Sequence, residues 1–423
     1  MKHISIKECY DTLEITDTNS EMSITNKEAD ELYKFIVKNK LDEDNIIWQR
    51  RGVTFINYVG YIKLPTFSIE ILPKIDINKN DLEQSRRMLL NMLQKSGLIK
   101  VDYSELSLLH NYKQNLGEIL AFLFAKKLQN ELIKGPYLQY ITMEENINLL
   151  KGKLILTEHI KNIATNKDKV YCAFEEFCID NNLNQILKHC VVNLIKSIRN
   201  PETIKLLKHC IVQFAYVSDR EIYPYELEKF SFNRLNNRYA SVFILAKMLL
   251  SGYSSTGSTG NDKSYSILFK MEEIFERYIG NLIARNIKDS VVYTQHSKYK
   301  LMIKEGKDTG IFQLKPDIVI EYEGKQTLIL DTKWKRIISR SSRYGIKRND
   351  IYQMYVYLTR YQDVKNVILL YPHNENIAKE AGEMLESWHL EDCIRKKIRV
   401  YSVSLSDEDQ AIRCLKKIIT YNR

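Results

Sequence analysis

The sequence lacks the features of a membrane or secreted protein. None of its apolar runs approaches the roughly 20 residues that a membrane-spanning helix needs. Its first residues, Met1–Glu8, lack the apolar core of a secretory signal. The 7 cysteines contain no Cys-x-x-Cys pair, and their odd number argues against a disulfide framework. These absences predict a cytoplasmic protein that contacts no membrane.

The sequence also lacks two common catalytic signatures. Residues 257–264 nearly match a phosphate-binding P-loop, but Asp262 stands where that motif needs a glycine. No arrangement of Ser, His and Asp typical of a covalent nucleophile is readable. Two His-Cys pairs, at 189–190 and 209–210, lack the ligand spacing of zinc sites, so their cysteines are expected to pack in a helical core. We therefore expect that this chain does not bind or hydrolyse a nucleotide itself.

The chain is predicted to be an α/β multidomain protein, because 423 residues suggest roughly two to three domains. The first region, residues 1–140, mixes strands and helices, and the second, 141–250, is mainly helical. The third region, 265–423, alternates helices and strands, which is typical of an α/β domain. Residues 251–260 are rich in Gly, Ser and Thr and predict a flexible linker before the third region.

Hydrophobic periodicity and turn residues set the expected elements. In the first region we expect strands at 48–55, 58–62 and 67–75, followed by helical spacing over 82–133. In the second region we expect helices at 182–198, 202–215 and 237–250. In the third region we expect helices at 267–287, 349–360 and 377–387, and strands at 314–322, 328–334, 367–371 and 398–404.

Two acidic residues and a lysine lie on the first two strands of the third region. Asp331 and Lys333 are two apart, so a strand would place both on one face. A glycine-containing turn between the strands predicts a hairpin. A turn centred between residues 323 and 324 would place Asp317 opposite residue 330, one place from Asp331. Diagonal neighbours in a hairpin are within reach of each other, so the sequence allows all three side chains to converge.

These residue types suit the hydrolysis of a phosphodiester. Carboxylate oxygens are the protein ligands that Mg²⁺ prefers. A lysine beside them could orient an attacking water and neutralise developing negative charge. The alternative interpretation is a pair of charged strand ends on a solvated face, and acid-x-Lys triplets also occur at 305–307, 323–325 and 363–365. Only the triplet at 331–333 ends an apolar strand and follows a Pro-Asp strand start, which favours a metal site.

The formal net charge of +10 favours an anionic partner. Basic residues are concentrated just after the proposed site, with Trp334 and Tyr344 among them. Such a stretch could follow a phosphate backbone, although a solvated loop of a basic protein would have the same composition. The candidate DNA-binding residues are Lys335, Arg336, Arg340, Arg343, Lys347 and Arg348.

Two predicted helices of the third region carry further candidates. Gln353 and Tyr357 are four apart and therefore share a helix face. In residues 271–278 the apolar side chains form a stripe typical of a core, and one glutamate there could turn inward to a metal. Both patterns are ordinary in amphipathic helices, so neither specifies a function by itself.

Together these residues resemble the PD-(D/E)xK nuclease superfamily. Asp317 follows Pro316 as the first acidic position, Asp331-Thr332-Lys333 resembles the second half of the motif, and Gln353-x-x-x-Tyr357 resembles a helix found in many members. Over most of its length the chain is similar to the McrC-type subunits of McrBC modification-dependent restriction systems. The segments that carry this similarity are 58–62, 69–75, 152–154, 181–184 and 271–278.

The resemblance implies a C-terminal nuclease domain of restriction-endonuclease type. It implies catalytic roles for Asp317, Asp331 and Lys333, with Gln353 beside them. It also implies Mg²⁺, or Mn²⁺ in its place, bound by Asp317, Asp331 and Glu276. The substrate would be double-stranded DNA, often methylated at cytosine.

The resemblance also implies a partner, a ring of AAA+ GTPase subunits of McrB type. The partner would bind GTP, and this chain would stimulate its GTPase activity through the N-terminal region, residues 1–140. Two alternatives stay open: a catalytically silent assembly subunit of the same complex, and a nuclease that acts without a partner in DNA repair.

Overall fold

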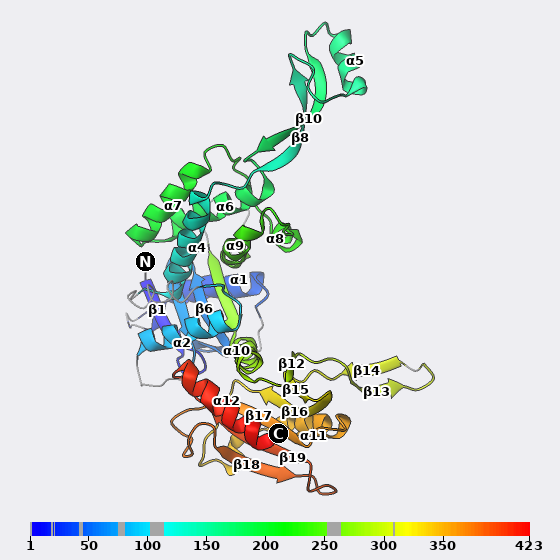
Figure 1. Ribbon diagram of the computed structural model, residues 1–423. Helices are drawn as coiled ribbons and strands as arrows, with labels where there is room; N and C mark the ends of the chain where they lie inside the picture. Colours follow the sequence, from blue (N-terminus) through cyan, green and yellow to red (C-terminus); the bar gives the residue numbers. More distant parts are fainter. Residues whose placement is uncertain are drawn as a thin grey trace. The chain divides into compact units, whose positions relative to one another are not determined.

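The computed structural model describes residues 2–17, 20, 22–41, 45–74, 81–101, 114–251, 264–307 and 309–423. The chain forms two compact units, shown in Figure 1: unit 1 contains residues 1–113 and 268–423, and unit 2 contains residues 114–267. The region boundaries at 140 and 250 stay a prediction. The P-loop-like stretch and the linker lie almost wholly outside the described residues. Within those residues, no helix is long and apolar enough to cross a membrane.

The N-terminal part of unit 1 contains two four-stranded sheets, in the orders β1-β7-β6-β11 and β3-β2-β5-β4. The strands are β1 (Lys2–Lys7), β2 (Leu13–Ile15), β3 (Ser23–Ile24), β4 (Ile46–Gln49), β5 (Gly52–Phe55), β6 (Tyr58–Lys63), β7 (Phe67–Leu72) and β11 (Tyr265–Lys270). The strands expected at 58–62 and 67–75 are therefore confirmed as β6 and β7, with residue 75 outside the described part. The single strand expected at 48–55 was wrong, because a turn at residues 50–51 divides it into β4 and β5.

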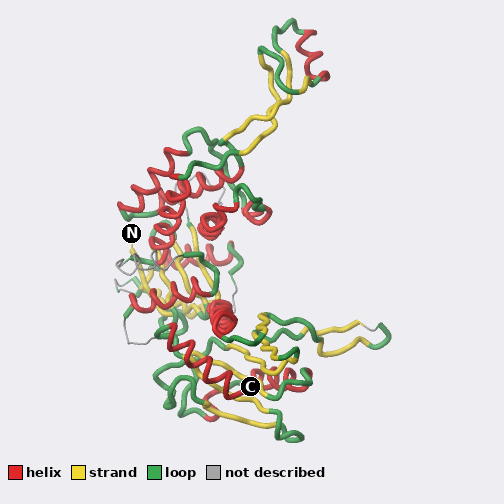
Figure 2. Tube along the Cα trace, in the orientation of Figure 1, coloured by secondary structure: helices red, strands yellow, loops and turns green. Residues whose placement is uncertain are grey.

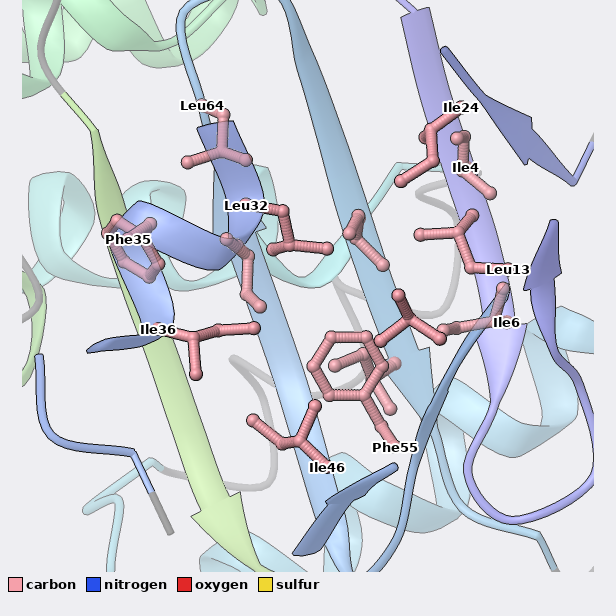
Figure 3. Close-up of a cluster of buried hydrophobic side chains, with 14 of the residues drawn as sticks. Ile4, Ile6, Leu13, Ile24, Leu32, Phe35, Ile36, Ile46, Phe55 and Leu64 are labelled. Carbon is pink, nitrogen blue, oxygen red and sulfur yellow. The ribbon is translucent and has the colours of Figure 1, made fainter. Parts of the chain in front are cut away.

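Helix α1 (Asn26–Lys38) packs its apolar side against these sheets. It begins with a capping box in which Thr25 and Glu28 each bond the other's backbone N–H. Figure 3 shows Leu32, Phe35 and Ile36 of α1 in the same buried cluster as Ile4 and Ile6 of β1. Side chains alternate between the two faces of a strand, which explains why Ser5 between the two isoleucines is left out of this cluster.

Helix α2 (Leu82–Lys95) packs against β7. Here β7 carries a fully buried carboxylate, Glu70, which accepts hydrogen bonds from Arg86 of α2 at 2.8 and 2.7 Å. A buried charge needs such a partner, because it has lost its hydration. The helical spacing expected over 82–133 is confirmed for α2 and α4 (Leu116–Ile133), and residues 102–113 lie outside the described part.

The C-terminal part of unit 1 is a six-stranded mixed sheet, in the order β12-β15-β16-β17-β19-β18. β15 and β16 pair antiparallel, whereas β16, β17 and β19 run parallel. The strands are β12 (Val291–Thr294), β15 (Ile318–Tyr322), β16 (Lys325–Thr332), β17 (Asn366–Pro372), β18 (Met384–His389) and β19 (Lys397–Val403). A separate hairpin, β13 (Lys300–Lys304) and β14 (Thr309–Gln313), lies between β12 and β15 along the chain.

Helices flank this sheet. α11 (Arg348–Arg360) shares a buried cluster with β15, β16 and β17, through Met354, Tyr357 and Leu358. α10 (Met271–Asn286) lies on the face that carries Ile318, whose Cγ1 is 3.8 Å from the Cβ position of Gly280. α12 (Glu408–Asn422) contacts α10 and β19, and η3 (Ser342–Gly345) is a short 3₁₀ turn before α11. This α/β arrangement was predicted from the sequence.

One expected helix of this part was wrong, and another begins later than expected. Of the helix expected at 377–387, residues 384–387 belong to strand β18, which pairs antiparallel with β19. Gly382 explains the difference, because its positive φ of 84° and its close approach to Cys414 interrupt any helix there. Residues 267–270, expected as the first turn of a helix, continue strand β11, and α10 begins at Met271.

Unit 2 combines a helical bundle with a projecting sheet. The helices are α4 (Leu116–Ile133), α6 (Asn182–Ser197), α7 (Pro201–Gln213), α8 (Pro224–Lys229), η2 (Asn237–Tyr239) and α9 (Ala240–Ser251). α6, α7 and α9 confirm the three helices expected between 182 and 250. Cys190 and Cys210 are buried among them, as predicted.

Within unit 2, Figure 2 shows two long strands that lead away from the helices. These are β8 (Gln139–Ile147) and β10 (Val170–Cys178), which pair antiparallel over nine residues each. At their far end lie β9 (Lys153–Leu154) and helix α5 (Leu156–Ala164). Large apolar side chains are exposed at this end: Leu149, Leu150, Leu156, Ile160 and Ile163.

Candidate functional site

The β15–β16 hairpin brings Asp317 beside Asp331. Next to the turn, the strands pair in the register predicted from the sequence. A β-bulge after Ile320 then shifts the pairing by one residue, so that Ile318 lies opposite Leu330. Continuing by one residue places Asp317 opposite Asp331 itself, whereas the prediction placed it opposite residue 330. The predicted register was therefore wrong at this end, because a bulge inserts a residue that no local pattern announces.

Asp331 is fully buried at the end of β16. Its Oδ2 forms an ion pair with the ammonium group of Lys333, and its Oδ1 has no hydrogen-bond partner among the described residues. Burial and the nearby negative charge of Asp317 raise the pKa of Asp331 to about 7, against the opposing effect of Lys333. A buried carboxylate with an unsatisfied oxygen is costly, so this site favours an added positive group.

Asp317 lies at the beginning of β15 and is half-buried. Its Oδ2 accepts hydrogen bonds from the backbone N–H and the hydroxyl of Thr332, both at 2.7 Å. These bonds favour the ionised form, but burial outweighs them and raises the pKa of Asp317. Both bonds use one oxygen, which leaves Oδ1 without a described hydrogen-bond partner.

Lys333 is held in place by the sheet and by α11. Its backbone N–H donates to the carbonyl of Leu370 in β17 at 2.9 Å, which continues the parallel ladder beyond β16. Its Nζ donates to Gln353 Oε1 at 3.1 Å, and Gln353 Nε2 donates to the Tyr357 hydroxyl at 2.9 Å. Burial alone would lower the pKa of Lys333, but the charge and hydrogen bond of Asp331 and the charges of Asp317 and Asp350 together outweigh burial and raise it. The predicted pair on one helix face thus orients the lysine.

Glu276 lies on α10 near the first aspartate. Burial and the charge of Asp317 raise the pKa of Glu276 to about 7. Its Oε1 accepts a hydrogen bond from the side chain of Gln295. Among the described residues, no three His, Cys, Asp or Glu side chains are close enough together to hold a metal ion. The structure thus brings Asp317, Asp331 and Lys333 together. Glu276 is near enough to sense the charge of Asp317, but it does not complete a set of three metal ligands.

Comparison with known proteins identifies the family. Residues 53–372 match the family model described as "McrBC 5-methylcytosine restriction system component". The chain belongs to this family. The resemblance to McrBC systems is thereby confirmed, whereas the PD-(D/E)xK assignment stays a prediction. No curated protein matches the chain.

Two solved structures show the same fold. One is a half-complex from an assembly of Thermococcus gammatolerans McrB AAA+ hexamers with bound McrC; it has a TM-score of 0.74 and 21% identity, covering 98% of this chain and 100% of that chain. The other is the T. gammatolerans McrBC complex, with a TM-score of 0.53 and 22% identity, covering 67% of this chain and 88% of that chain. At these identities the likeness shows the α/β multidomain fold alone.

The basic residues that follow β16 in this McrBC family member divide into two groups. Lys335 Nζ contacts both carboxylate oxygens of the buried Asp350 at 2.8 Å, and Arg336 pairs with Glu375 at 2.9 Å. These two cations are therefore already neutralised. The other four candidate DNA-binding residues are exposed: Arg340, Arg343, Lys347 and Arg348. Asp350 was missed by sequence reasoning, although it lies one helix turn before Gln353.

Sequence reasoning also missed the buried carboxylate of Glu8, which contacts Trp334, the residue directly after Lys333. It is fully buried and accepts hydrogen bonds from the indole N–H of Trp334 and the backbone N–H of Asn57, each at 2.5 Å. Lys74 Nζ donates to the carbonyl of Trp334 at 3.2 Å. Burial raises the pKa of Glu8, and the charge of Lys74 opposes this rise. No local pattern could have revealed a contact between residues 326 positions apart.

Asn57 extends this contact to α10. It has a positive φ of 61°, which asparagine tolerates better than most residues. Its carbonyl accepts from the N–H of Met271 at 2.8 Å, and its side-chain Oδ1 accepts from the N–H of Glu272 at 3.0 Å. Asn57, in the connection between β5 and β6, thereby caps the helix that carries Glu276 in the manner of an N-cap residue. We define Glu8, Asn57, Lys74 and Trp334 as the buried junction.

The raised pKa of Asp331 predicts how metal-free protein responds to pH. The folded-state pKa of about 7 exceeds the reference value of 3.8, so ionised Asp331 destabilises the fold. Protonated Asp331 therefore contributes to the stability of the fold. This contribution is fully present below pH 3.8 and is lost as pH rises through 7. In EDTA at pH 8, Asp331→Asn should raise Tm by about 1–2 °C, equivalent to ~1 kcal/mol for a chain of 423 residues.

Differential scanning fluorimetry between pH 5 and 8 measures this difference, which should shrink toward pH 5. Mg²⁺ at pH 8 should raise the Tm of the wild-type protein and leave that of Asp331→Asn almost unchanged. An equal Mg²⁺ effect on both proteins would contradict a metal at Asp331.

Proposed function

We propose that this chain is the DNA endonuclease subunit of a GTP-dependent, modification-dependent restriction complex of McrBC type. The observation that carries the proposal is the convergence of Asp317, Asp331 and Lys333 at one end of the mixed sheet. Membership of the McrBC family supports it. On this proposal the C-terminal part of unit 1 is the PD-(D/E)xK domain expected from the sequence.

The donor set fits a hard divalent cation such as Mg²⁺ or Mn²⁺. Asp331 Oδ1 is buried without a partner, and both aspartates carry raised pKa values that a nearby cation would lower. Mg²⁺ is commonly bound by one or two carboxylates and completes its coordination with water. Asp317 and Asp331 would hold it, with Glu276 as the third candidate. When bound, such a cation neutralises charge on the phosphate and lowers the pKa of a bound water.

The chain's own groups would do the remaining work. Lys333 places a positive charge beside the two carboxylates, where it can stabilise negative charge that develops on the phosphate. Gln353 presents its carbonyl oxygen to Lys333, because its amide nitrogen is engaged by Tyr357. Burial raises the pKa of Tyr357, so its hydroxyl stays neutral at working pH. The lysine is thus positioned before the substrate arrives.

We further propose an AAA+ GTPase of McrB type as the partner. The T. gammatolerans assembly contains McrB AAA+ hexamers with bound McrC, and its fold covers nearly all of this chain. GTP would be bound by the partner. The reconstituted complex is therefore the form in which to test activity.

Plasmid cleavage tests the function. Purified chain, its AAA+ partner, GTP, Mg²⁺ and methylated plasmid are combined, and each component is left out in turn. Cutting that needs every component supports the proposal. Stimulation of the partner's GTPase without cutting, while DNA is bound, would favour the silent assembly subunit instead. Cutting without the partner would favour a nuclease that acts alone.

The exposed end of unit 2 is a candidate contact for the partner. Leu156, Ile160 and Ile163 lie on one side of α5 and are 60–65% exposed. Apolar patches of this kind often mark protein interfaces. We expect Leu156→Asp with Ile160→Asp to reduce stimulation of the partner's GTPase about tenfold, equivalent to ~1.4 kcal/mol of binding.

The competing prediction is partner binding through the N-terminal region, residues 1–140. A second pair of variants therefore places the same charge in that region. Tyr33→Asp with Val37→Asp changes two exposed residues of α1. A loss of stimulation for this pair, with none for the α5 pair, would show that the partner binds the N-terminal region. Thermal melts of both variants exclude unfolding as the cause.

A further inference from the structure

We propose that the β13–β14 hairpin is an arm that binds duplex DNA beside the catalytic carboxylates, an inference that rests on the proposed nuclease function. Figure 1 shows the hairpin extending away from the six-stranded sheet. The chain enters it after β12 and leaves it just before Asp317. The N–H of Gln295 donates to the carbonyl of Asp317 at 2.9 Å, which joins the two ends of the insertion. The arm therefore begins and ends at the candidate site.

The base of the arm is fixed against α11. The ring of Tyr299 meets that of Tyr361 edge-on, with centroids 4.6 Å apart, and His296 Nδ1 is hydrogen-bonded to the Tyr361 hydroxyl at 2.8 Å. Gln313 Nε2 donates to the carbonyl of Tyr299 at 2.8 Å, and Arg360 Nε donates to that of Lys300 at 3.1 Å. These contacts hold the direction of the arm relative to the helix that orients Lys333.

The outer part of the arm has no such support. Every residue of β13 is exposed, including Met302 and Ile303, which are 56% and 65% exposed. Phe312 on β14 is 66% exposed. An isolated two-stranded ribbon is marginally stable in water, so apolar side chains of this size are expected to meet another surface.

The charge of the arm indicates what that surface is. Its lysines are exposed and form no ion pair with a described carboxylate, and they outnumber the two acidic residues of this segment, Glu305 and Asp308. The lysines are Lys298, Lys300, Lys304, Lys307 and Lys315. The major groove of B-DNA admits a two-stranded ribbon, with lysines reaching phosphates and apolar groups meeting sugar or thymine methyl groups. A polyanion therefore fits the arm better than an apolar protein face does.

DNA binding by full-length protein tests the arm. Asp331→Asn is used throughout, so that binding is measured without cleavage. Fluorescence anisotropy with a labelled 30-base-pair duplex is recorded at several salt concentrations. We expect Lys300→Ala/Lys304→Ala/Lys307→Ala to weaken binding about tenfold at 0.1 M salt. The slope of log K against log [salt] should fall by about 0.9 for each phosphate contact that is lost.

The control removes as many positive charges from an exposed face of the same unit. Arg413, Lys416 and Lys417 are exposed on α12, and their triple alanine variant should keep the slope of the Asp331→Asn parent protein. Met302→Ser/Ile303→Ser/Phe312→Ser should weaken binding while the slope stays unchanged. Equal slopes for the arm and control lysine variants would overturn the proposal.

A second outcome would also overturn the proposal. If the serine variant shifts a dimer to a monomer in sedimentation while its DNA affinity is unchanged, the arm is a contact between two copies of this chain. Because cleavage plays no part in these measurements, a failure of the nuclease function would leave the result on the arm intact. Conversely, if the chain is an active nuclease but the arm lysine variant has an unchanged salt slope, only the proposal that the arm binds DNA is rejected.

Discussion

Asp331→Asn and Lys333→Ala are each expected to reduce plasmid cleavage by the reconstituted complex by about 10²–10³-fold. Asp331 is the most buried acidic group of the site and has one oxygen without a partner. Replacing it with an amide removes the charge that would attract the cation. Replacing Lys333 removes the positive charge beside the phosphate and leaves Asp331 without its ion-pair partner.

The hairpin itself supplies a matched control. Glu323-Gly324-Lys325 repeats the acid-x-Lys spacing at the turn, where all three residues are exposed. Glu323→Gln and Lys325→Ala should therefore leave cleavage within about twofold of wild type, as for most surface substitutions. Partner GTPase stimulation should persist in all four variants, which shows that the complex still assembles. Cutting at the wild-type level by Asp331→Asn or Lys333→Ala would reject the site.

Local patterns predicted most of the elements around this site. β17, β19 and α11 fall within one or two residues of their expected ends, because long apolar runs and helix spacing are strong signals. The hairpin turn was also placed correctly. The bulge after Ile320 was not, since it depends on how the two strands pack rather than on either strand alone.

Contacts between distant segments were beyond the reach of sequence patterns. A glutamate in the first strand-like segment reads as an ordinary surface residue, yet Glu8 is buried against Trp334. The start of α10 depends in the same way on Asn57, which lies more than 200 residues earlier in the chain. The basic stretch shows the same limit. Lys335 and Arg336 form ion pairs with Asp350 and Glu375, and no local sequence pattern predicts these pairs.

The buried junction leads to the second large prediction: Glu8→Ala should lower kcat for cleavage about 10²-fold and leave KM for DNA nearly unchanged. Glu8 touches neither the carboxylates nor Lys333, so it is a positioning residue. Its loss leaves the N–H groups of Trp334 and Asn57 buried without an acceptor, which such groups tolerate poorly. Trp334 directly follows Lys333, and Asn57 caps the helix of Glu276. Displacements of about 1 Å at reacting groups can cost about 10²-fold in rate.

Glu70 provides the control that separates positioning from stability. It is as fully buried as Glu8, and its carboxylate pairs with Arg86 in the same N-terminal part of the chain. Glu70→Ala should lower Tm at least as much as Glu8→Ala, because it also leaves a buried charge without its partner. It should keep kcat within about threefold of wild type, provided that assays run well below both melting temperatures. Equal losses of kcat in the two variants would mean that Glu8 acts through stability alone.

A double-mutant cycle identifies the route. Trp334→Phe keeps an aromatic ring against Phe275, whose centroid lies 5.4 Å away, and removes the indole N–H that Glu8 accepts. If Glu8 positions Lys333 through this bond, Glu8→Ala should slow the Trp334→Phe enzyme far less than it slows wild type, since coupled residues are not additive. Full additivity would leave the route through Asn57 and α10. In either case Glu8, which directly follows β1, influences the catalytic end of β16, so that cleavage depends on the folding of the N-terminal sheets.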